Sequence, residues 1–333
     1  MKSIWLVSTA LVAVAVVRAQ GGLPASVAGG LSVGKTFSGK AMVGKTMDSP
    51  DNFSRAAGLV AVRPLGPGVA TSARREGLEQ DPGEMQTGRP GCTTAPDVLG
   101  AGVMQIESGF TFASDKTGSQ KRQTAGIGAP LLGMGIGHGV ELRVGGDGYQ
   151  SHSHATGSLV ERSSGVADSS FGAKIRLLKE NGSRPAISLI PRLSLPTGGR
   201  VISSSSYEPA INISWSHRLP REFSAGGSLD FAATTGHEGR HMQPGASLSI
   251  GHLLPGGLVG FGEVYRVSIG GSEASTTSMF DRGATYVVGR NAQLDMSVGR
   301  DLRPSAPCWF GAVGLVLRGA GRIYEGFEGS GRR

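Results

Sequence analysis

The chain has 333 residues, including 55 glycines, and only 38% of its residues are hydrophobic and 17% are charged. Its apolar residues are too scattered for transmembrane helices, which need about 20 consecutive apolar residues. The formal net charge of +8 comes from Lys and Arg residues that are neither clustered nor accompanied by an aromatic-basic motif, so the composition gives no support for a nucleic-acid partner.

Residues 1–19 have the features of a secretory signal peptide. Lys2 gives a positive start, residues 4–17 form an apolar run, and residues 17–19 fit a small-residue cleavage site. The run is too short for a comfortable membrane helix, so an N-terminal anchor that stays in place is the less favoured alternative. We therefore expect the chain to be exported to the periplasm.

Residues 20–97 form an extension rich in Gly, Pro, Ser and Ala. Its apolar residues keep neither a helical nor a strand period, which is typical of a segment without fixed structure. We predict a periplasmic extension. The alternative is a small plug folded inside a barrel made by the rest of the chain, although the segment has few large apolar residues to hold it there.

From residue 98 to residue 318, short runs of alternating apolar and polar residues are separated by turn signals. The alternation is cleanest after Ala292, where Leu294 and Met296 fall on one face and Asp295 and Ser297 on the other. This period of two indicates strands with one apolar and one polar face. About twelve such runs begin near residues 103, 124, 140, 171, 187, 211, 223, 248, 259, 284, 292 and 309.

A membrane can cover the apolar face of such a sheet if the sheet closes and leaves no unpaired edge. Bacterial barrels have an even number of strands, short periplasmic turns and longer outer loops. Short connections near residues 133–139, 180–184, 220–222, 255–257 and 289–291 alternate with longer ones near 114–120, 151–167, 197–206, 235–240, 268–278 and 301–307. The sequence therefore predicts an all-β fold, a transmembrane antiparallel up-and-down β-barrel of about 12 strands over residues 98–318.

Charged residues within the predicted strands are expected to face the lumen, because a charge on the lipid face at mid-depth costs roughly 2–4 kcal/mol. These lumen-lining candidates are Glu107, Glu141, Arg143, Lys174, Arg176, Asp230, Glu263 and Asp295. Glu263 shares its face with Phe261 and Tyr265. Either that strand inverts through a bulge among nearby glycines, or its aromatic side chains line the lumen, which would suit an apolar solute.

Six short motifs occur along the predicted barrel. They are GFTF at residues 109–112, VELR at 140–143, FGAK at 171–174, LSLPTG at 193–198, FGEVY at 261–265 and NAQLD at 291–295. In this order they resemble the outer-membrane β-barrel transporter family named for a meta-pathway of phenol degradation. The resemblance implies a location in the outer membrane of a Gram-negative envelope and a porin-like pore for small solutes, including aromatic or apolar ones.

An outer-membrane barrel also implies two partners, the membrane lipid and the barrel-assembly machinery. Such barrels usually end at the last strand with an aromatic residue that this machinery reads. Here residues 319–333 continue as a Gly- and Arg-rich tail.

No pattern in the sequence favours an enzyme or a cofactor. There is no G-x-S-x-G elbow, and no helix follows a Gly-rich phosphate loop. The two cysteines are too few for a disulfide framework and lack metal-site spacing. His152 with His154, and His237 with His241, could approach one another to bind a metal, but loop histidines are commoner than loop metal sites. We predict no metal and no catalytic residues, although a hydrolase at the edge of the lumen stays open.

We therefore predict an outer-membrane channel or transporter for small solutes. The alternative is a structural or adhesive barrel that acts through its outer loops without transport. Lumen charges of both signs favour a narrow polar path, and outer loops of moderate length with few aromatic residues do not favour a large binding surface. Conductance of the purified barrel in a planar bilayer distinguishes the two.

Overall fold

The computed structural model describes Met85, Thr87, Gly88 and residues 91–236, 239–269, 275–289, 291–302 and 308–320. These residues belong to one compact unit, Asp48–Arg333, and the other unit, Met1–Met47, contains none of them. The predicted signal peptide, most of the predicted extension and the tail beyond Ala320 lie outside the described residues.

The described residues form 14 β-strands. They are β1 (Val103–Thr117), β2 (Gln120–Gly137), β3 (Val140–Gly146), β4 (Tyr149–Thr156), β5 (Leu159–Val166), β6 (Ser169–Leu178), β7 (Ala186–Leu195), β8 (Glu208–Leu219), β9 (Phe223–Gly236), β10 (Gly239–Leu254), β11 (Leu258–Ile269), β12 (Ser275–Val288), β13 (Ala292–Asp301) and β14 (Cys308–Ala320). Within this part of the chain, no helix is long and apolar enough to cross a membrane.

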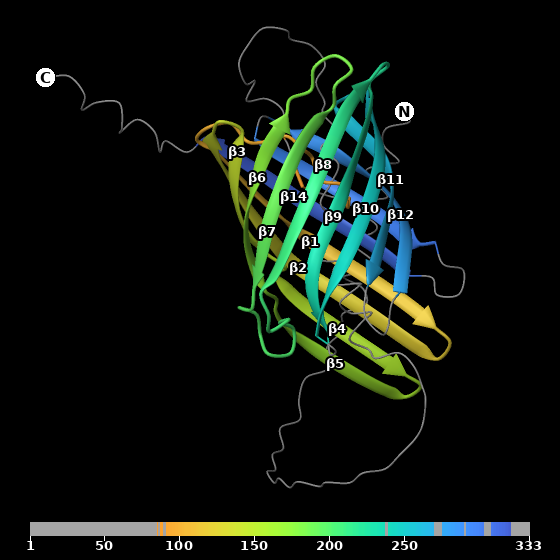
Figure 1. The fold of residues 1–333 in the computed structure, drawn as a ribbon. Coiled ribbons are helices and arrows are strands. Elements are labelled where there is room, and N and C mark those ends of the chain that lie inside the picture. Colours follow the sequence, from red (N-terminus) through yellow and green to blue (C-terminus); the bar gives the residue numbers. More distant parts are fainter. Residues whose placement is uncertain are drawn as a thin grey trace, which may run out of the picture. The chain divides into compact units, whose positions relative to one another are not determined.

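The sheet closes on itself (Figure 1). Neighbouring strands are antiparallel, and β1 pairs with both β14 and β2, which joins the two ends of the sheet. β3 and β4 are two parts of one strand separated by Asp147 and Gly148, and β5 and β6 are separated by Ala167 and Asp168. The ring therefore contains 12 strands in up-and-down order, which confirms the predicted barrel. Closure satisfies the backbone polar groups of the ring, as a bilayer requires.

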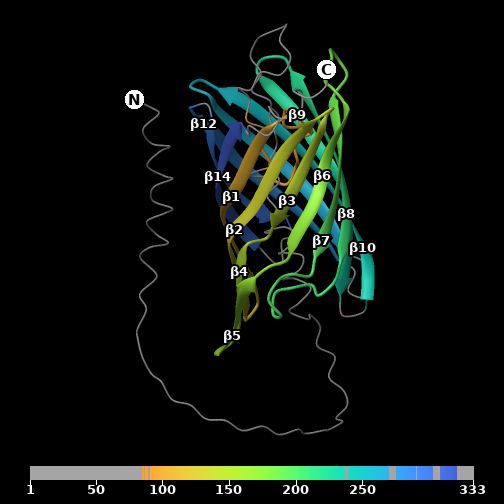
Figure 2. The same ribbon diagram turned by 90° about the vertical axis from the view of Figure 1, so that its left-hand side faces the viewer.

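β4 and β5 form a hairpin that continues past one end of the ring. The first half of β2 pairs with β4 and its second half with β3, whereas β5 pairs with β4 alone. The hairpin projects from the lower end of the barrel in Figure 2. The prediction of a long loop over residues 151–167 is wrong because these Ser- and His-containing strands are polar on both faces, and the period of two is visible only where one face is apolar.

The predicted alternation of short and long connections holds only in part. Residues 220–222 and 255–257 are tight turns at one end, and residues 196–207 form a long connection at the other. At that second end, however, residues 118–119 alone separate β1 from β2, because both strands continue through the predicted loop 114–120.

The strands also define the ends of the barrel. β1 begins at Val103, where the first alternating run is predicted, and β14 continues past residue 318, the predicted end of the barrel. Val103 pairs with Ala320. Gly319 and Ala320 therefore belong to the barrel and not to the predicted tail.

Burial alternates along the strands, with the apolar residues outside. In β13, Asp295 and Ser297 are buried, whereas Leu294 and Met296 are 50% and 43% exposed. A water-soluble protein would bury the apolar Leu294 and Met296 and expose the polar Asp295 and Ser297. In a bilayer the observed order is the stable one, because lipid accepts apolar side chains and disfavours charged ones.

Candidate functional site in the lumen

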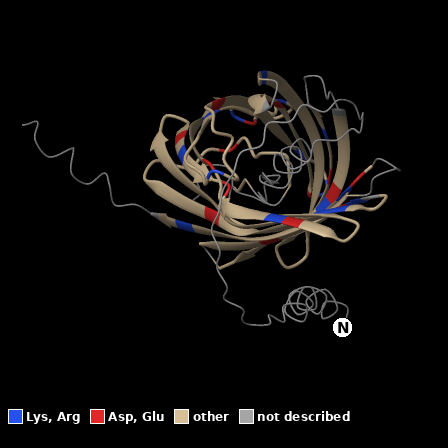
Figure 3. Cartoon of the chain, turned by 90° about the horizontal axis from the view of Figure 1, so that it is seen from below, with Lys and Arg blue, Asp and Glu red and all other residues tan. Residues whose placement is uncertain are grey.

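All eight lumen-lining candidates lie on the inward faces of their strands, next to outward apolar residues. Six are buried, namely Glu107, Glu141, Arg143, Lys174, Glu263 and Asp295. Arg176 and Asp230 are half-buried. Figure 3 looks into the ring and shows acidic and basic residues on its strands. The inside of the barrel is therefore polar and carries both signs of charge.

The burial pattern of β11 decides between the two alternatives for Glu263. Val259, Phe261, Glu263 and Tyr265 are all buried, and β11 pairs with β10 and β12 without a shift of register. A bulge would have displaced the register by one residue. The strand does not invert, so the side chains of Phe261 and Tyr265 face inward with Glu263.

A stretch of chain before β1 lies inside the ring (Figure 3), and we call residues 91–100 the lumen segment. Thr93, Thr94, Ala95 and Leu99 are buried. The sequence predicts a periplasmic extension without fixed structure up to residue 97. The structure differs for residues 91–97, which contact the barrel wall as in the plug alternative.

Two inward carboxylates hold the lumen segment by its backbone. Glu263 accepts hydrogen bonds from the N–H groups of Cys92 at 2.6 Å and Thr93 at 2.7 Å. Glu141 accepts one from the N–H of Leu99 at 3.1 Å. Hydrogen bonds to an ionised acceptor are roughly twice as strong as neutral ones. Large apolar side chains are therefore not needed to fix the segment, which is why its composition did not reveal it.

The middle of the lumen segment is held through its carbonyl groups. The Lys174 ammonium donates a hydrogen bond to the carbonyl oxygen of Asp97 at 2.9 Å, and the Ser188 hydroxyl donates one to the carbonyl oxygen of Pro96. Burial raises the pKa of the Asp97 carboxyl above its ordinary value, and the positive charge of Lys174 opposes this rise.

Two further contacts with the barrel wall lie before the lumen segment and at its end. Both carboxylate oxygens of Glu107 accept a hydrogen bond from the N–H of Gly88, at 3.1 and 3.0 Å. At the other end of the lumen segment, a Cβ placed on Gly135 of β2 would overlap the carbonyl oxygens of Leu99 and Gly100. Only glycine allows the segment to pass so close to the wall.

The structure brings three of the candidates together on neighbouring strands. Glu141 and Lys174 are register partners in β3 and β6, and Arg143 Nε lies 3.3 Å from Glu141 Oε1. All three are buried, so this group sets a strong local field beside the lumen segment.

The remaining candidates are distributed around the ring. Asp230 in β9 accepts a hydrogen bond from the Asn212 amide at 2.6 Å. Arg176 lies toward the end of β6 that adjoins the β2–β3 turn. Its backbone N–H donates a hydrogen bond to the carbonyl oxygen of Gly139 at 2.8 Å. Asp295 is buried in β13.

The predicted set omits several inward charged residues of the described strands, among them Asp115, Asp301, Asp281 and Arg192. Asp281 in β12 is buried and is the register partner of Glu263, and Arg192 in β7 lines a cavity. Asp281 falls between the predicted loop 268–278 and the predicted strand from residue 284. The sequence signal that could have found Asp281 is the large apolar residue beside it, Phe280. In the structure Phe280 is 38% exposed between two buried neighbours, as an outward residue of the strand.

A cavity of about 160 Å³ lies between the lumen segment and the wall. Its lining includes Cys92, Thr94, Arg143, Ile190, Arg192, Asp230 and Tyr265. Pockets for drug-sized ligands measure about 300–1,000 Å³, so this space suits only a small molecule. It offers charges of both signs beside an aromatic and an aliphatic surface.

The histidine pairs considered from the sequence do not form a cluster of three metal-ligating side chains in the described residues. His152 and His154 lie in β4 and not in a loop. His152 Nδ1 lies 3.2 Å from the Thr124 hydroxyl of β2. His237 lies outside the described residues.

A closed ring of antiparallel strands with an apolar outer face and a polar lumen is the architecture of outer-membrane β-barrels. The chain belongs to the family described as "Putative MetA-pathway of phenol degradation", whose model matches residues 87–319. This match confirms the resemblance found in the sequence motifs. It takes in the lumen segment together with the barrel.

Solved structures of low sequence identity are similar to this chain. The COG4313 outer membrane channel from Pseudomonas putida F1 is 14% identical over 67% of this chain and 97% of that chain, with a TM-score of 0.52. The translocator domain of autotransporter NalP from Neisseria meningitidis is 12% identical over 66% of this chain and 90% of that chain, with a TM-score of 0.45. The CymD monoaromatic hydrocarbon channel is 8% identical over 67% of this chain and 89% of that chain, with a TM-score of 0.40. None of the curated proteins matches the chain.

Proposed function

We propose that this chain is an outer-membrane channel that lets small solutes cross through its lumen after export directed by its signal peptide. The observation that carries the proposal is a polar, charged lumen enclosed by a wall whose outer face is apolar. Membership of the family and the fold shared with an outer membrane channel support it. The lipid of the outer membrane and the barrel-assembly machinery are the partners that such a protein needs.

The cavity suggests the kind of solute. Arg143, Arg192 and Asp230 offer charges, whereas Ile190 and Tyr265 offer apolar contact. A small molecule with an aromatic or apolar body and one polar group would match both. The eight lumen-lining candidates would then act on the solute by field and contact, without covalent chemistry, and the channel is not an enzyme.

The rival function is a structural or adhesive barrel that acts through its outer end. The β4–β5 hairpin, which extends past the ring, is the observation in its favour. A barrel of this kind would not need a conducting lumen. Conductance therefore separates the two functions.

The test uses purified protein in a planar bilayer under a salt gradient. We expect the native chain to conduct and the double variant Arg143→Ala with Lys174→Ala to shift the reversal potential toward cation preference. Removing one charge about 4 Å from the ion path changes the energy of a passing ion by about 1 kcal/mol in a water-like lumen. This corresponds to a several-fold change in the ratio of cation to anion permeability.

The matched control is Arg162→Ala with Lys179→Ala, which removes two positive charges from exposed positions outside the lumen. It should leave the reversal potential unchanged. Folding of each variant is checked by the difference in gel mobility between heated and unheated samples. A folded native barrel that stays silent would support the structural or adhesive function and count against the channel.

A further inference from the structure

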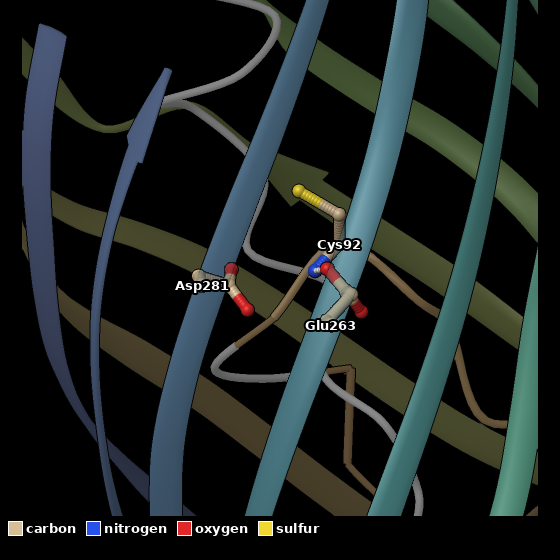
Figure 4. Close-up of side chains that lie close together, drawn as sticks. All are labelled: Cys92, Glu263 and Asp281. Atoms are coloured by element: carbon tan, nitrogen blue, oxygen red, sulfur yellow. Dashed lines mark hydrogen bonds between the residues drawn. The ribbon is translucent and has the colours of Figure 1, made fainter. Parts of the chain in front are cut away.

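Three potential metal ligands meet on the inner wall of the barrel. Cys92 comes from the lumen segment, Glu263 from β11 and Asp281 from β12 (Figure 4). The Cys92 Sγ atom and one carboxylate oxygen from each of the other two all lie within 4.8 Å of one another. Among the described residues, no other group of three or more His, Cys, Asp or Glu side chains is placed in this way.

The two carboxylates of this group face each other without a positive partner. Glu263 and Asp281 are register partners on neighbouring strands, and each is only 1% exposed. In the described part of the chain, no Lys, Arg or His forms an ion pair with either of them. Like charges directly opposite each other destabilise a sheet, and a buried charge without a partner is costly.

Asp281 provides an independent observation that points to a ligand. Its Oδ1 atom is buried and has no hydrogen-bond partner. Glu263, in contrast, accepts backbone hydrogen bonds on both oxygens, which fix the position of its carboxylate. A buried carboxylate oxygen without a donor, next to a fixed carboxylate and a thiol, is the arrangement that a cation would complete.

We propose that Cys92, Glu263 and Asp281 bind one divalent transition-metal ion of the zinc type. Zn²⁺ accepts thiolate sulfur at about 2.3 Å and carboxylate oxygen at about 2.0–2.2 Å. Tetrahedral coordination at these lengths puts ligand atoms about 3.4–3.6 Å apart, so small side-chain rotations would close the site. Calcium and magnesium take oxygen ligands only, so the thiolate selects against them.

The ion would reach the site from the lumen and tie the lumen segment to the wall. Cys92 lines the lumen cavity, which gives the entry path and leaves the fourth coordination position open to water. Coordination adds a second attachment next to the hydrogen bonds from Cys92 and Thr93 to Glu263. The proposal concerns binding of the ion and does not depend on which solute the barrel carries.

The first test is a cobalt titration of the purified full chain under reducing conditions, because Co²⁺ occupies zinc sites and gives a thiolate-to-metal charge-transfer band. We expect the band to saturate at one ion per chain and to disappear when Zn²⁺ competes. Cys92→Ser should abolish the band. Asp281→Asn should weaken Co²⁺ binding at least tenfold, since even outer partners of metal ligands change affinity by 10–100-fold.

The matched control is Cys308→Ser, which removes the thiol of the other cysteine and should leave the band unchanged. Gel mobility of unheated samples confirms that each variant is a folded barrel. The proposal is overturned if the native chain gives no band, if the band survives Cys92→Ser, if Asp281→Asn binds Co²⁺ as tightly as the native chain, or if Cys308→Ser removes the band.

A second measurement does not require a change at any proposed ligand. In the Cys308→Ser chain, Cys92 is the remaining thiol because the sequence has two cysteines. Zn²⁺ should slow alkylation of Cys92 at least tenfold, and a chelator should restore the rate. An alkylation rate that is the same with and without Zn²⁺ would overturn the proposal even if Cys92→Ser failed to fold.

Discussion

Single side chains in this protein follow the rules of a barrel in lipid. Met296 lies near the middle of β13, where its register partners are Ala284 and Val313, and it is 43% exposed. The next residue, Ser297, is buried. The two positions differ by one step along the chain but face different solvents, because successive residues of a strand point to opposite faces.

The substitution Met296→Arg tests this assignment of faces. A charge at mid-depth on the lipid face costs roughly 2–4 kcal/mol, so we expect a large loss of folded barrel in the outer membrane. The heat-dependent change in gel mobility measures that fraction. Met296→Leu is the control and should assemble normally. Equal assembly of the two variants would mean that β13 has the opposite orientation.

At the scale of elements, the barrel wall and the lumen segment are fitted to each other. Glycine at position 135 lets the backbone of Leu99 and Gly100 pass against β2. Carboxylates on β1, β3 and β11 accept the N–H groups that this part of the chain cannot pair in a strand. Unpaired backbone donors are costly where water is scarce, so these bonds explain why an irregular segment is stable inside the ring.

The substitution Gly135→Ala should loosen the lumen segment without preventing assembly. The new Cβ would overlap the carbonyl oxygens of Leu99 and Gly100, so that stretch must move. We expect faster proteolysis before β1 and a higher conductance of the purified barrel.

Gly262→Ala is the matched control, because a Cβ there meets no atom closer than 3.9 Å. It makes the same chemical change in a strand of the same barrel and should leave both readouts unaltered. If the two variants behaved alike, the close approach at Gly135 would not be what holds the segment.

At the scale of the whole molecule, ring closure puts the two ends of the barrel chain side by side. Val103 at the start of β1 pairs with Ala320 at the end of β14. Tight turns such as residues 179–185 and 220–222 lie at that same end, and the β4–β5 hairpin lies at the other. In bacterial barrels the short turns face the periplasm, so we expect the hairpin to face the cell exterior.

Two engineered cysteines test this topology in a chain whose native cysteines are replaced by serine. Ser158→Cys lies in the turn between β4 and β5 and should react with an impermeant thiol reagent on intact cells. Ser183→Cys lies in the turn between β6 and β7 and should react only after the outer membrane is broken. Both positions are exposed, so accessibility differs only by the side of the membrane. The reverse labelling pattern would invert the barrel.

The sequence by itself determined the barrel. Alternation such as that of Leu294 and Asp295 is a local property of each strand, and it repeats often enough to give the number of strands and their faces. It failed in β4 and β5, where both faces are polar and the period has no contrast. For Glu263 the alternation left two alternatives, because aromatic side chains that face the lumen and a strand that inverts through a bulge produce the same sequence pattern.

Only the tertiary structure decided what occupies the lumen. The hydrogen bond from Thr93 to Glu263 joins residues 170 positions apart, and its donor is a backbone N–H that carries no sequence signature. The meeting of Cys92 with Glu263 and Asp281 likewise depends on the register between β11 and β12 and on the path of the lumen segment. Closure of the ring fixes these distances. Closure depends on all twelve strands of the ring together, so the alternation within a single strand does not predict it.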